Sequence, residues 1–292
     1  MITRLRLAAC GLWLSLIGSV NAAPGSPGPV RSENGSQPTQ PVNVFNAHGQ
    51  DPREGVDLSR DRALRPIVQV NGTTAFLVSP CYALAAYHAV FGFAKAGDSK
   101  PSVPVLIWDE EQGGPTFKTV AASPEMWGDG HIQSAIREDW VLLKLSTCEG
   151  KRIGWLELID GRTDASLAGQ PIVIAGYPND KPKTRLWRDR TGHVQQEGQG
   201  QFLDCLLNSA ATRGGNSGSP LYQEEAGIPV VVGLQVRERG SSSGIILTYD
   251  ARQANIAVDV RSIARRIGHV ISGDKDVFWA ERPEYADQNP SH

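Results

Sequence analysis

The chain has 292 residues, of which 40% are hydrophobic and 21% charged, and this ordinary globular composition excludes disorder throughout. The 29 basic residues are balanced by 31 acidic ones, which gives a formal net charge of -2 and argues against a broad basic surface for nucleic acid. We therefore expect no nucleic-acid partner. The length suffices for one large all-β domain or two packed barrels.

Residues 1–22 have the pattern of a secretory signal peptide. Arg4 and Arg6 precede the apolar run LAACGLWLSLIGSV, which is followed by the small residues of NAAPG. The run has roughly 14 residues, short of the ~20 that a membrane-spanning helix needs. A lipoprotein-like box, LAAC, is discounted because the apolar run continues past Cys10. We expect cleavage after Ala22 and an exported protein, periplasmic or secreted, with no membrane anchor in its mature form.

Residues 23–60 are rich in Pro, Gly, Ser and Gln and show little apolar periodicity. Such a segment buries too little apolar surface to order itself, which predicts a disordered tail or a pro-segment. A linker is the alternative interpretation. The folded domain is expected to begin at residue 61 and to end at residue 271.

Short apolar or β-branched runs, each bounded by Gly, Pro, Asn or Asp, begin after Leu64 and predict β-strands. They read RPIVQV, TTAFLVS, YALAAYHAV, VPVLIWD, DWVLLKL, QPIVIAGY, VVVGLQV and GIILTYD. Only DVRSIARRI has helical spacing, which predicts a helix over residues 259–268. Many short strands before one terminal helix indicate an all-β barrel or sandwich, and residues 272–292 are expected to form a polar tail.

Three cysteines remain if the signal peptide is removed: Cys81, Cys148 and Cys205. Disulfides persist in the compartments that exported proteins reach, and three cysteines allow at most one internal bridge. The chain has no CxxC motif and no Cys/His ligand spacing, so we expect no metal site and no organic cofactor.

The heptapeptide GGNSGSP, residues 214–220, places the hydroxyl of Ser217 at the centre of a turn of small residues. Taken alone, such a turn is more often structural than catalytic. Serine hydrolysis also needs a base that activates the hydroxyl and an acid that orients the base. Gly215 can adopt a conformation closed to other residues, so its N–H and that of Ser217 can converge as an oxyanion hole.

His88 is the candidate base, because it ends the apolar strand ALAAYH and would emerge at a barrel rim. Asp139 is the candidate acid, because it directly precedes a buried apolar run; the alternative is a charged loop edge shared with Glu138. The other histidines lie in polar loops or terminal segments, where solvated roles are favoured. They include His48, His131, His269 and His292.

The order His88, Asp139, Ser217 on a strand-rich exported chain resembles the trypsin/chymotrypsin-fold serine peptidases, and in particular their bacterial glutamyl-endopeptidase branch. YALAAYHAV stands where the family has its histidine strand, DWVLLKL where it has its aspartate strand, and GGNSGSP where it has its nucleophile loop. AGYPNDKPKTRLWRDRTGHV is similar to the family stretch GYPGDKP…W…G. The resemblance implies two packed six-stranded antiparallel β-barrels, at about 61–155 and 156–258.

The resemblance further implies a serine endopeptidase in which Ser217 attacks the scissile bond, His88 carries the proton and Asp139 orients His88. We expect protein or peptide substrates and a monomer. The alternative is a catalytically inactive binding protein on the same fold, which Tyr87, where the family has a small residue, and Glu238 would support. An esterase is less favoured, because the α/β-hydrolase order is Ser, acid, His.

In the glutamyl branch, a threonine before the nucleophile and a histidine on the following strand hold the substrate carboxylate. Thr212 matches the threonine, whereas the uncharged Gln235 stands at the histidine position. Arg237 and Glu238 replace the usual small pocket edge, where Arg213 or Arg237 could bind an acidic side chain and Glu238 a basic one. The cleavage preference is left open.

No cysteine follows His88, so the family's usual disulfide around the histidine is absent. Cys81 precedes the histidine strand and Cys148 follows the aspartate strand. We hypothesise that these two cysteines pair if the two strands are adjacent, and that Cys205 is free.

Overall fold

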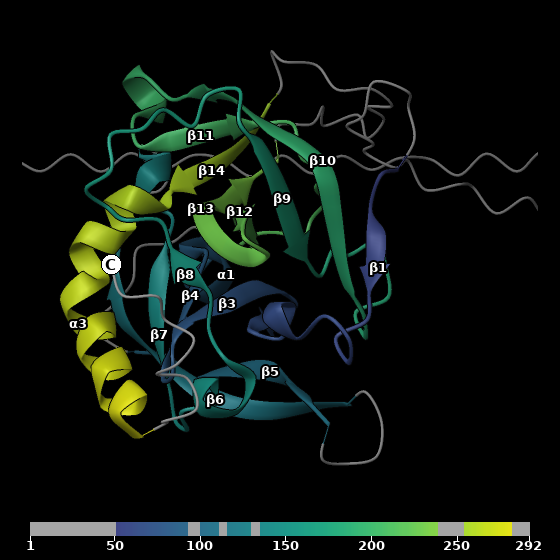
Figure 1. Cartoon of the computed structure of the whole chain (residues 1–292), viewed down its shortest axis with the longest axis vertical. Coiled ribbons are helices and arrows are strands. Elements are labelled where there is room, and N and C mark those ends of the chain that lie inside the picture. The colour runs from purple at the N-terminus through teal and green to yellow at the C-terminus, as the bar shows by residue number, and fades with distance from the viewer. Residues whose placement is uncertain (1–50, 93–99, 111–115, 130–134, 239–253, 282–292) are drawn as a thin grey trace, which may run out of the picture. The chain divides into compact units, whose positions relative to one another are not determined.

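The computed structural model describes residues 51–92, 100–110, 116–129, 135–238 and 254–281. Two antiparallel β-barrels and a long C-terminal helix form the architecture (Figure 1). The all-β fold with two six-stranded barrels, predicted from the sequence, is therefore confirmed. The predicted strand GIILTYD lies outside the described residues.

The first barrel closes in the order β2-β3-β4-β7-β6-β5. Its side chains alternate in direction along each strand, as a period of two requires. In β3, for example, Ala75 and Leu77 contribute to the barrel core, whereas Phe76 and Val78 join the larger apolar cluster outside the barrel. The strands are β2 (Ile67–Val70), β3 (Thr73–Ser79), β4 (Tyr82–Ala85), β5 (Val103–Asp109), β6 (Thr116–Trp127) and β7 (Val141–Leu145).

The second barrel follows the order β10-β11-β14-β13-β12-β9 and closes through the pairing of β9 with β10. Two short strands extend its sheet: β1 (Glu54–Val56) pairs with β10, and β8 (Glu157–Leu158) pairs with β13. The barrel strands are β9 (Pro171–Gly176), β10 (Leu186–Glu197), β11 (Cys205–Asn208), β12 (Pro220–Glu225), β13 (Ile228–Arg237) and β14 (Asn255–Asp259).

A single apolar cluster joins the outer faces of the two barrels. It includes Phe76 and Leu84 of the first barrel and Tyr177 and Leu234 of the second, all fully buried. Because this cluster is continuous, the loops at the ends of the barrels are held on one rigid support. The short helices on these connections are η1 (Arg62–Leu64), α1 (Tyr87–Phe91), η2 (Ile136–Glu138), α2 (Gly150–Ile153) and η3 (Gly200–Phe202).

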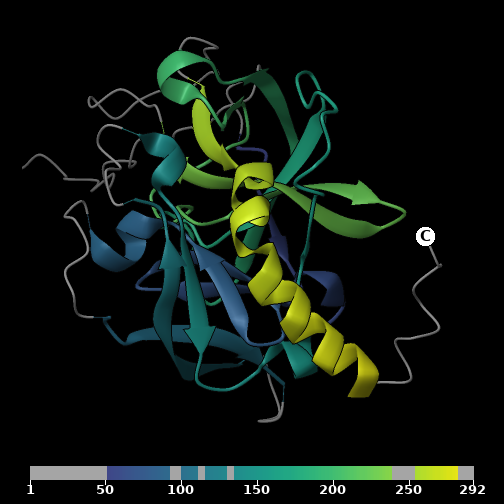
Figure 2. The ribbon, with the colours of Figure 1, turned by 90° about the vertical axis from the view of Figure 1, so that its left-hand side faces the viewer.

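The C-terminal helix α3 (Val260–Glu281) is longer than the predicted helix over 259–268, and the prediction of a polar tail from residue 272 is wrong for 272–281. Figure 2 shows α3 crossing from the second barrel to the first. Ile271 packs into the apolar cluster and Asp274 accepts hydrogen bonds from the first barrel. These contacts outweigh the weak helix propensity of Gly268 and Gly273 and extend α3 beyond the predicted end.

The N-terminal segment 51–60 is ordered, although the sequence placed it in a disordered tail up to residue 60. Arg53 is buried and donates to Asp51 at 2.8 Å and to Asp180 at 2.6 Å. Ion pairs and the β1–β10 pairing order this segment, so its lack of apolar periodicity was misleading. Among the described residues, no helix combines the length and apolar character that crossing a bilayer requires.

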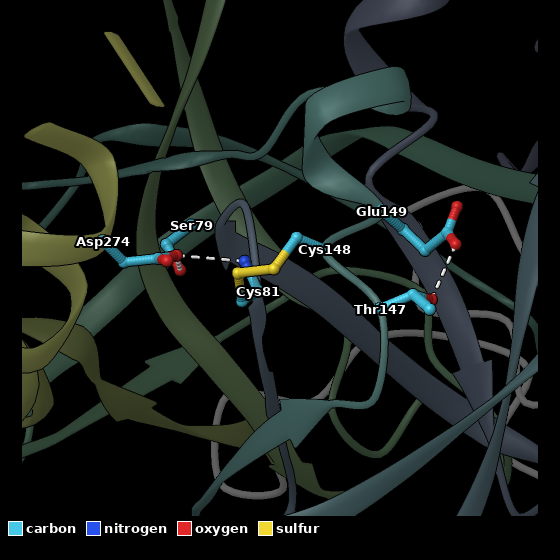
Figure 3. Close-up of a disulfide and its surroundings, with 6 residues drawn as sticks. All are labelled: Ser79, Cys81, Thr147, Cys148, Glu149 and Asp274. Atoms are coloured by element: carbon cyan, nitrogen blue, oxygen red, sulfur yellow. Dashed lines mark hydrogen bonds between the residues drawn. A yellow bond between two sulfur atoms is a disulfide. The ribbon is translucent and has the colours of Figure 1, made fainter. Parts of the chain in front are cut away.

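A disulfide links Cys81, directly before β4, to Cys148, after β7 (Figure 3). Strands β4 and β7 are hydrogen-bonded neighbours, which is the condition under which this pairing was hypothesised. Cys205 is a free, buried thiol, and burial raises its pKa to about 12. The thiol is therefore protonated at neutral pH and is not a competing nucleophile.

Candidate active site

His88, Asp139 and Ser217 meet although they come from three separate segments. His88 lies in the first turn of the short helix α1, directly after β4, and not at the end of the strand as predicted. Asp139 lies between η2 and β7, and Ser217 lies in the loop that joins β11 to β12. His88 Nδ1 is 2.8 Å from Asp139 Oδ2, and His88 Nε2 is 2.9 Å from Ser217 Oγ.

The Asp139 carboxyl group contacts His88 twice. It accepts the His88 backbone N–H at 3.0 Å through Oδ1, while Oδ2 faces the ring nitrogen Nδ1. Asp139 is only 2% exposed. Because an ionised carboxylate only accepts hydrogen bonds, Nδ1 must carry a proton, and Nε2 is left to accept the proton of the Ser217 hydroxyl. The arrangement therefore selects the imidazole tautomer that general-base chemistry needs.

The nucleophile loop, residues 213–219, begins with a tight turn. The Asn216 N–H donates to the Arg213 carbonyl at 2.9 Å, and Gly215, third in this turn, has a φ of 95°. A positive φ at this position is the mark of a type II turn and favours glycine. A Cβ atom on Gly215 would also lie 2.6 Å from the Tyr177 carbonyl oxygen, so only glycine fits here.

The Gly215 and Ser217 amides are available for an oxyanion. Within the described ranges, neither N–H donates to a protein acceptor. The carbonyls of the same two residues both accept hydrogen bonds from Thr74. The Thr74 hydroxyl donates to the Gly215 carbonyl at 2.8 Å, and the Thr74 N–H donates to the Ser217 carbonyl at 3.0 Å. Fixing the carbonyls in this way orients the neighbouring peptide groups.

Thr74 of β3 contacts the nucleophile loop, and the sequence analysis did not name it. Its hydroxyl also accepts the Tyr177 N–H at 3.0 Å, so one buried side chain connects the first barrel, the segment after β9 and the nucleophile loop. Gly218 packs against the same residue: its φ is 86°, and a Cβ atom there would lie 2.0 Å from the Thr74 carbonyl oxygen. The Thr74 strand, TTAFLVS, holds two other hydroxyl residues, Thr73 and Ser79, so the sequence does not single out Thr74.

Tyr87 does not displace His88 from its partners. Its side chain is fully buried and stacks on Phe91 of the same helix, with ring centroids 4.7 Å apart. The neighbouring His88 keeps its contacts with both Asp139 and Ser217. The structure therefore accommodates this large residue within the core.

Gln235 of β13 lies beside the nucleophile loop, because its carbonyl accepts the Gly218 N–H at 2.7 Å. Its side chain donates to the Arg237 carbonyl at 2.9 Å and accepts from Asn208 at 3.2 Å. Thr212 is 1% exposed, and its hydroxyl has no protein partner in the described part of the chain. Gln235 thus lies near Ser217, and Thr212 precedes Ser217 by five residues in the chain; their place in a substrate pocket stays a prediction.

Arg213 and Glu238 form an ion pair with a distance of 3.9 Å between Nη1 and Oε1. The two charges offset each other at the edge of the candidate pocket. Asn208, which holds the Gln235 amide, was not predicted as a site residue, since a buried asparagine in the short strand β11 carries no distinctive sequence signal. Within the described ranges, no three His, Cys, Asp or Glu side chains are grouped so that they could bind a metal ion.

Comparison with known proteins places this geometry in a family context. The glutamyl endopeptidase of Bacillus licheniformis is 24% identical over 205 residues, which are 67% of this chain and 60% of that protein. The glutamyl endopeptidase of Staphylococcus aureus strain MW2 is 33% identical over 92 residues, 30% of this chain and 26% of that protein. This chain thus matches less than two thirds of the length of either relative.

A solved structure of a Glu endopeptidase in complex with MPD superimposes on the model with a TM-score of 0.56 and 22% identity, covering 78% of this chain and 100% of the other. This likeness supports the two-barrel fold. The family model described as a trypsin-like peptidase domain matches residues 73–234, a range that includes His88, Asp139 and Ser217. Since that range is more than half of the 292 residues, the chain belongs to the family of trypsin-like peptidase domains.

Proposed function

We propose that this protein is an exported serine endopeptidase that hydrolyses peptide bonds through His88, Asp139 and Ser217. The observation that carries the proposal is the continuous relay Asp139–His88–Ser217, with contacts of 2.8 and 2.9 Å. The relay joins both barrels, so a substrate that reaches Ser217 meets base, nucleophile and amide donors together. Protein or peptide substrates and a monomeric enzyme are part of the proposal, and no metal or organic cofactor is invoked.

The proposed reaction has two stages. Ser217 Oγ attacks the scissile carbonyl carbon while His88 Nε2 takes the hydroxyl proton, and the resulting imidazolium is stabilised by the Asp139 carboxylate. The oxyanion lies between the Gly215 and Ser217 N–H groups. His88 then gives its proton to the leaving amine, which departs and leaves an acyl-enzyme. Water, deprotonated by His88, attacks the ester and releases the acid and the free Ser217 hydroxyl.

The alternative of an inactive binding protein rested on Tyr87 and Glu238. Tyr87 packs into the core beside an undisturbed His88, and Glu238 is paired with Arg213. Both observations favour the enzyme over the alternative.

Active-site labelling tests the proposal. The purified mature protein should react with a fluorophosphonate at Ser217, and Ser217→Ala should abolish the labelling. Ser219→Ala is the matched control, because Ser219 is a buried serine of the same loop whose hydroxyl faces no partner in the described chain. A wild-type protein that stays unlabelled after removal of any pro-segment would contradict the proposal. Sequencing its N-terminus tests the export step, which predicts a start at Ala23.

The substrate pocket is proposed to involve Thr212, Gln235, Arg237 and Glu238. The named relatives are glutamyl endopeptidases, but here Gln235 is neutral and the charge of Arg213 is offset by Glu238. We therefore expect a weaker preference for glutamate over glutamine before the scissile bond than a charged pocket would give. A library of peptides that differ only at that residue measures this preference.

A further inference from the structure

Lys183 lies in the loop between β9 and β10 and contacts both barrels. Its ammonium group donates to the Gly72 carbonyl at 2.8 Å, in the turn between β2 and β3 of the first barrel. It also donates to the carbonyl of Tyr177, which directly follows β9 of the second barrel. The Lys183 carbonyl in turn accepts from the Gln69 side chain at 3.0 Å. A half-buried lysine thus connects two segments that flank the nucleophile loop.

The same ammonium group lies against Gly215. A Cβ atom placed on Gly215 would be 2.6 Å from Lys183 Nζ. Since the Cβ and nitrogen atoms of one residue are about 2.5 Å apart, Nζ is within about 5 Å of the Gly215 amide nitrogen. That amide is one of the two proposed oxyanion donors.

The segment held by Lys183 orients this amide directly. Two residues after Tyr177, the N–H of Asn179 donates to the Gly214 carbonyl at 2.7 Å. The Gly214 carbonyl and the Gly215 N–H belong to one planar trans peptide group and point in opposite directions. Fixing the carbonyl on Asn179 therefore aims the N–H away from Asn179. Gly215 alone would not fix this peptide, because glycine samples many backbone conformations.

We propose that Lys183 is a positioning residue for the oxyanion hole. Its ammonium group holds the segment 177–179 against the Gly214–Gly215 peptide, and this contact keeps the Gly215 N–H directed at the reacting carbonyl. The inference rests on the proposed peptidase function. By this inference, Lys183 supports the transition state although it lies outside the triad and outside the proposed substrate pocket.

The charge of Lys183 is poised to change near neutral pH. Burial lowers the pKa of Lys183 to about 8, and the carboxylate of Asp180 on the same loop opposes this shift. The groups that face Lys183 from the first barrel, Gln69 and Gly72, and from the nucleophile loop, Gly215, are uncharged. The phenol of Tyr177 is directed to the Ile67 carbonyl. A neutral amine is a weaker donor than an ammonium group, so the grip on Tyr177 weakens above about pH 8.

The test compares the rate at which a fluorophosphonate labels Ser217, between pH 6 and 10, in the wild type, Lys183→Met and Lys183→Arg. Labelling by Lys183→Met at pH 7 should be about 10- to 100-fold slower, less than the full loss of one oxyanion donor. The KM for a peptide should change less than about twofold, since only transition-state binding is affected. Lys183→Arg should restore the rate and retain it past pH 9, because a guanidinium group stays charged.

Lys181→Met is the matched control, because Lys181 lies on the same loop but pairs with Asp51 at 2.8 Å. Its labelling rate and pH profile should equal those of the wild type. An equal loss in Lys181→Met, or wild-type rates and profile in Lys183→Met, would overturn the inference. If Lys183→Met fails to fold, the pH profile of Lys183→Arg decides the test. A labelling rate that declines at the same alkaline pH in Lys183→Arg as in the wild type would then overturn the inference. A wild type without any labelling contradicts the proposed function itself.

Discussion

The two halves of the candidate site are held in different ways. His88 and Asp139 both belong to the first barrel: His88 follows β4 and Asp139 precedes β7. These two strands are paired, and the disulfide Cys81–Cys148 links their other ends. The nucleophile loop of the second barrel has no such covalent link, although the Thr74 hydroxyl donates to its Gly215 carbonyl. It is held by backbone hydrogen bonds to Thr74, Asn179 and Gln235 and by glycines with positive φ. Substitutions in the first half should therefore damage the chemistry, and those in the second half should damage the geometry.

Asp139→Asn should produce the largest effect, and it tests the first half. The amide cannot accept the Nδ1 proton in the same way as the carboxylate, so His88 would present the wrong tautomer to Ser217. We expect kcat to fall by about 10⁴-fold with an unchanged fold. Circular dichroism and peptide kinetics measure the two quantities. A loss of less than about tenfold would show that Asp139 only supports the loop edge with Glu138, the structural alternative that its sequence context left open.

Gly218→Ala should be next, and it tests the second half. The added Cβ atom would lie 2.0 Å from the Thr74 carbonyl oxygen, at a residue whose φ is 86°. The loop must move away from the first barrel, so both labelling of Ser217 and stability should fall, the latter by about 3 kcal/mol.

Gly227→Ala is the control for backbone strain alone. Gly227 has a similar φ of 83° in the β12–β13 hairpin, but a Cβ atom there meets nothing within 4 Å. Gly227→Ala should lower the free energy of unfolding by about 1 kcal/mol and leave the labelling of Ser217 unchanged. If both variants behave alike in denaturant titrations and labelling, the close approach to Thr74 is not what fixes the nucleophile loop.

Asp274→Ala should affect stability without affecting chemistry. Asp274 of α3 accepts the Ser79 hydroxyl at 2.6 Å and the Cys81 N–H at 3.0 Å, next to the disulfide (Figure 3). Its removal leaves two donors of the β3–β4 turn without their partner, which should lower the free energy of unfolding by about 1–3 kcal/mol. Asp276→Ala, at an exposed position of the same helix, should be neutral. Any large change in kcat would mean that α3 also positions His88 or Asp139.

The sequence predicted those parts of the fold that depend on apolar pattern. Strands such as β3 and β9 contain continuous runs of apolar residues, so they are recognisable as strands from the local sequence alone. Strand β10, with the sequence LWRDRTGHVQQE, is largely polar and was not recognised. Its strand conformation depends on pairing with β1, β9 and β11, which local sequence does not reveal. The extension of α3 past Gly268 has the same cause, because contacts with the first barrel maintain it.

The candidate site divides in the same manner. His88, Asp139 and Ser217 carry the residue types that the chemistry needs, and their order along the chain made them visible. Thr74 and Lys183 act by joining loops that are remote in sequence, and nothing in their own surroundings predicts which loops meet. The sequence thus singled out the three residues of the proposed relay, whereas the residues that hold the surrounding loops are visible only in the packing of the two barrels.

The smallest expected effect is a pH dependence of stability that separates the two roles of Lys183. Its pKa is about 8 in the folded chain, below the ordinary value of 10.5 for an unfolded chain, so between these values the unfolded state binds more protons. Stability should therefore rise with pH across this window, by an amount of order 1 kcal/mol because a half-buried side chain remains screened by solvent. Activity should fall over the same window.

Denaturant titrations of the wild type and Lys183→Met isolate the contribution of this residue from other groups. Equal slopes with pH in both proteins would mean that Lys183 keeps its proton, and that the second half of the site is not weakened by alkaline pH through this lysine.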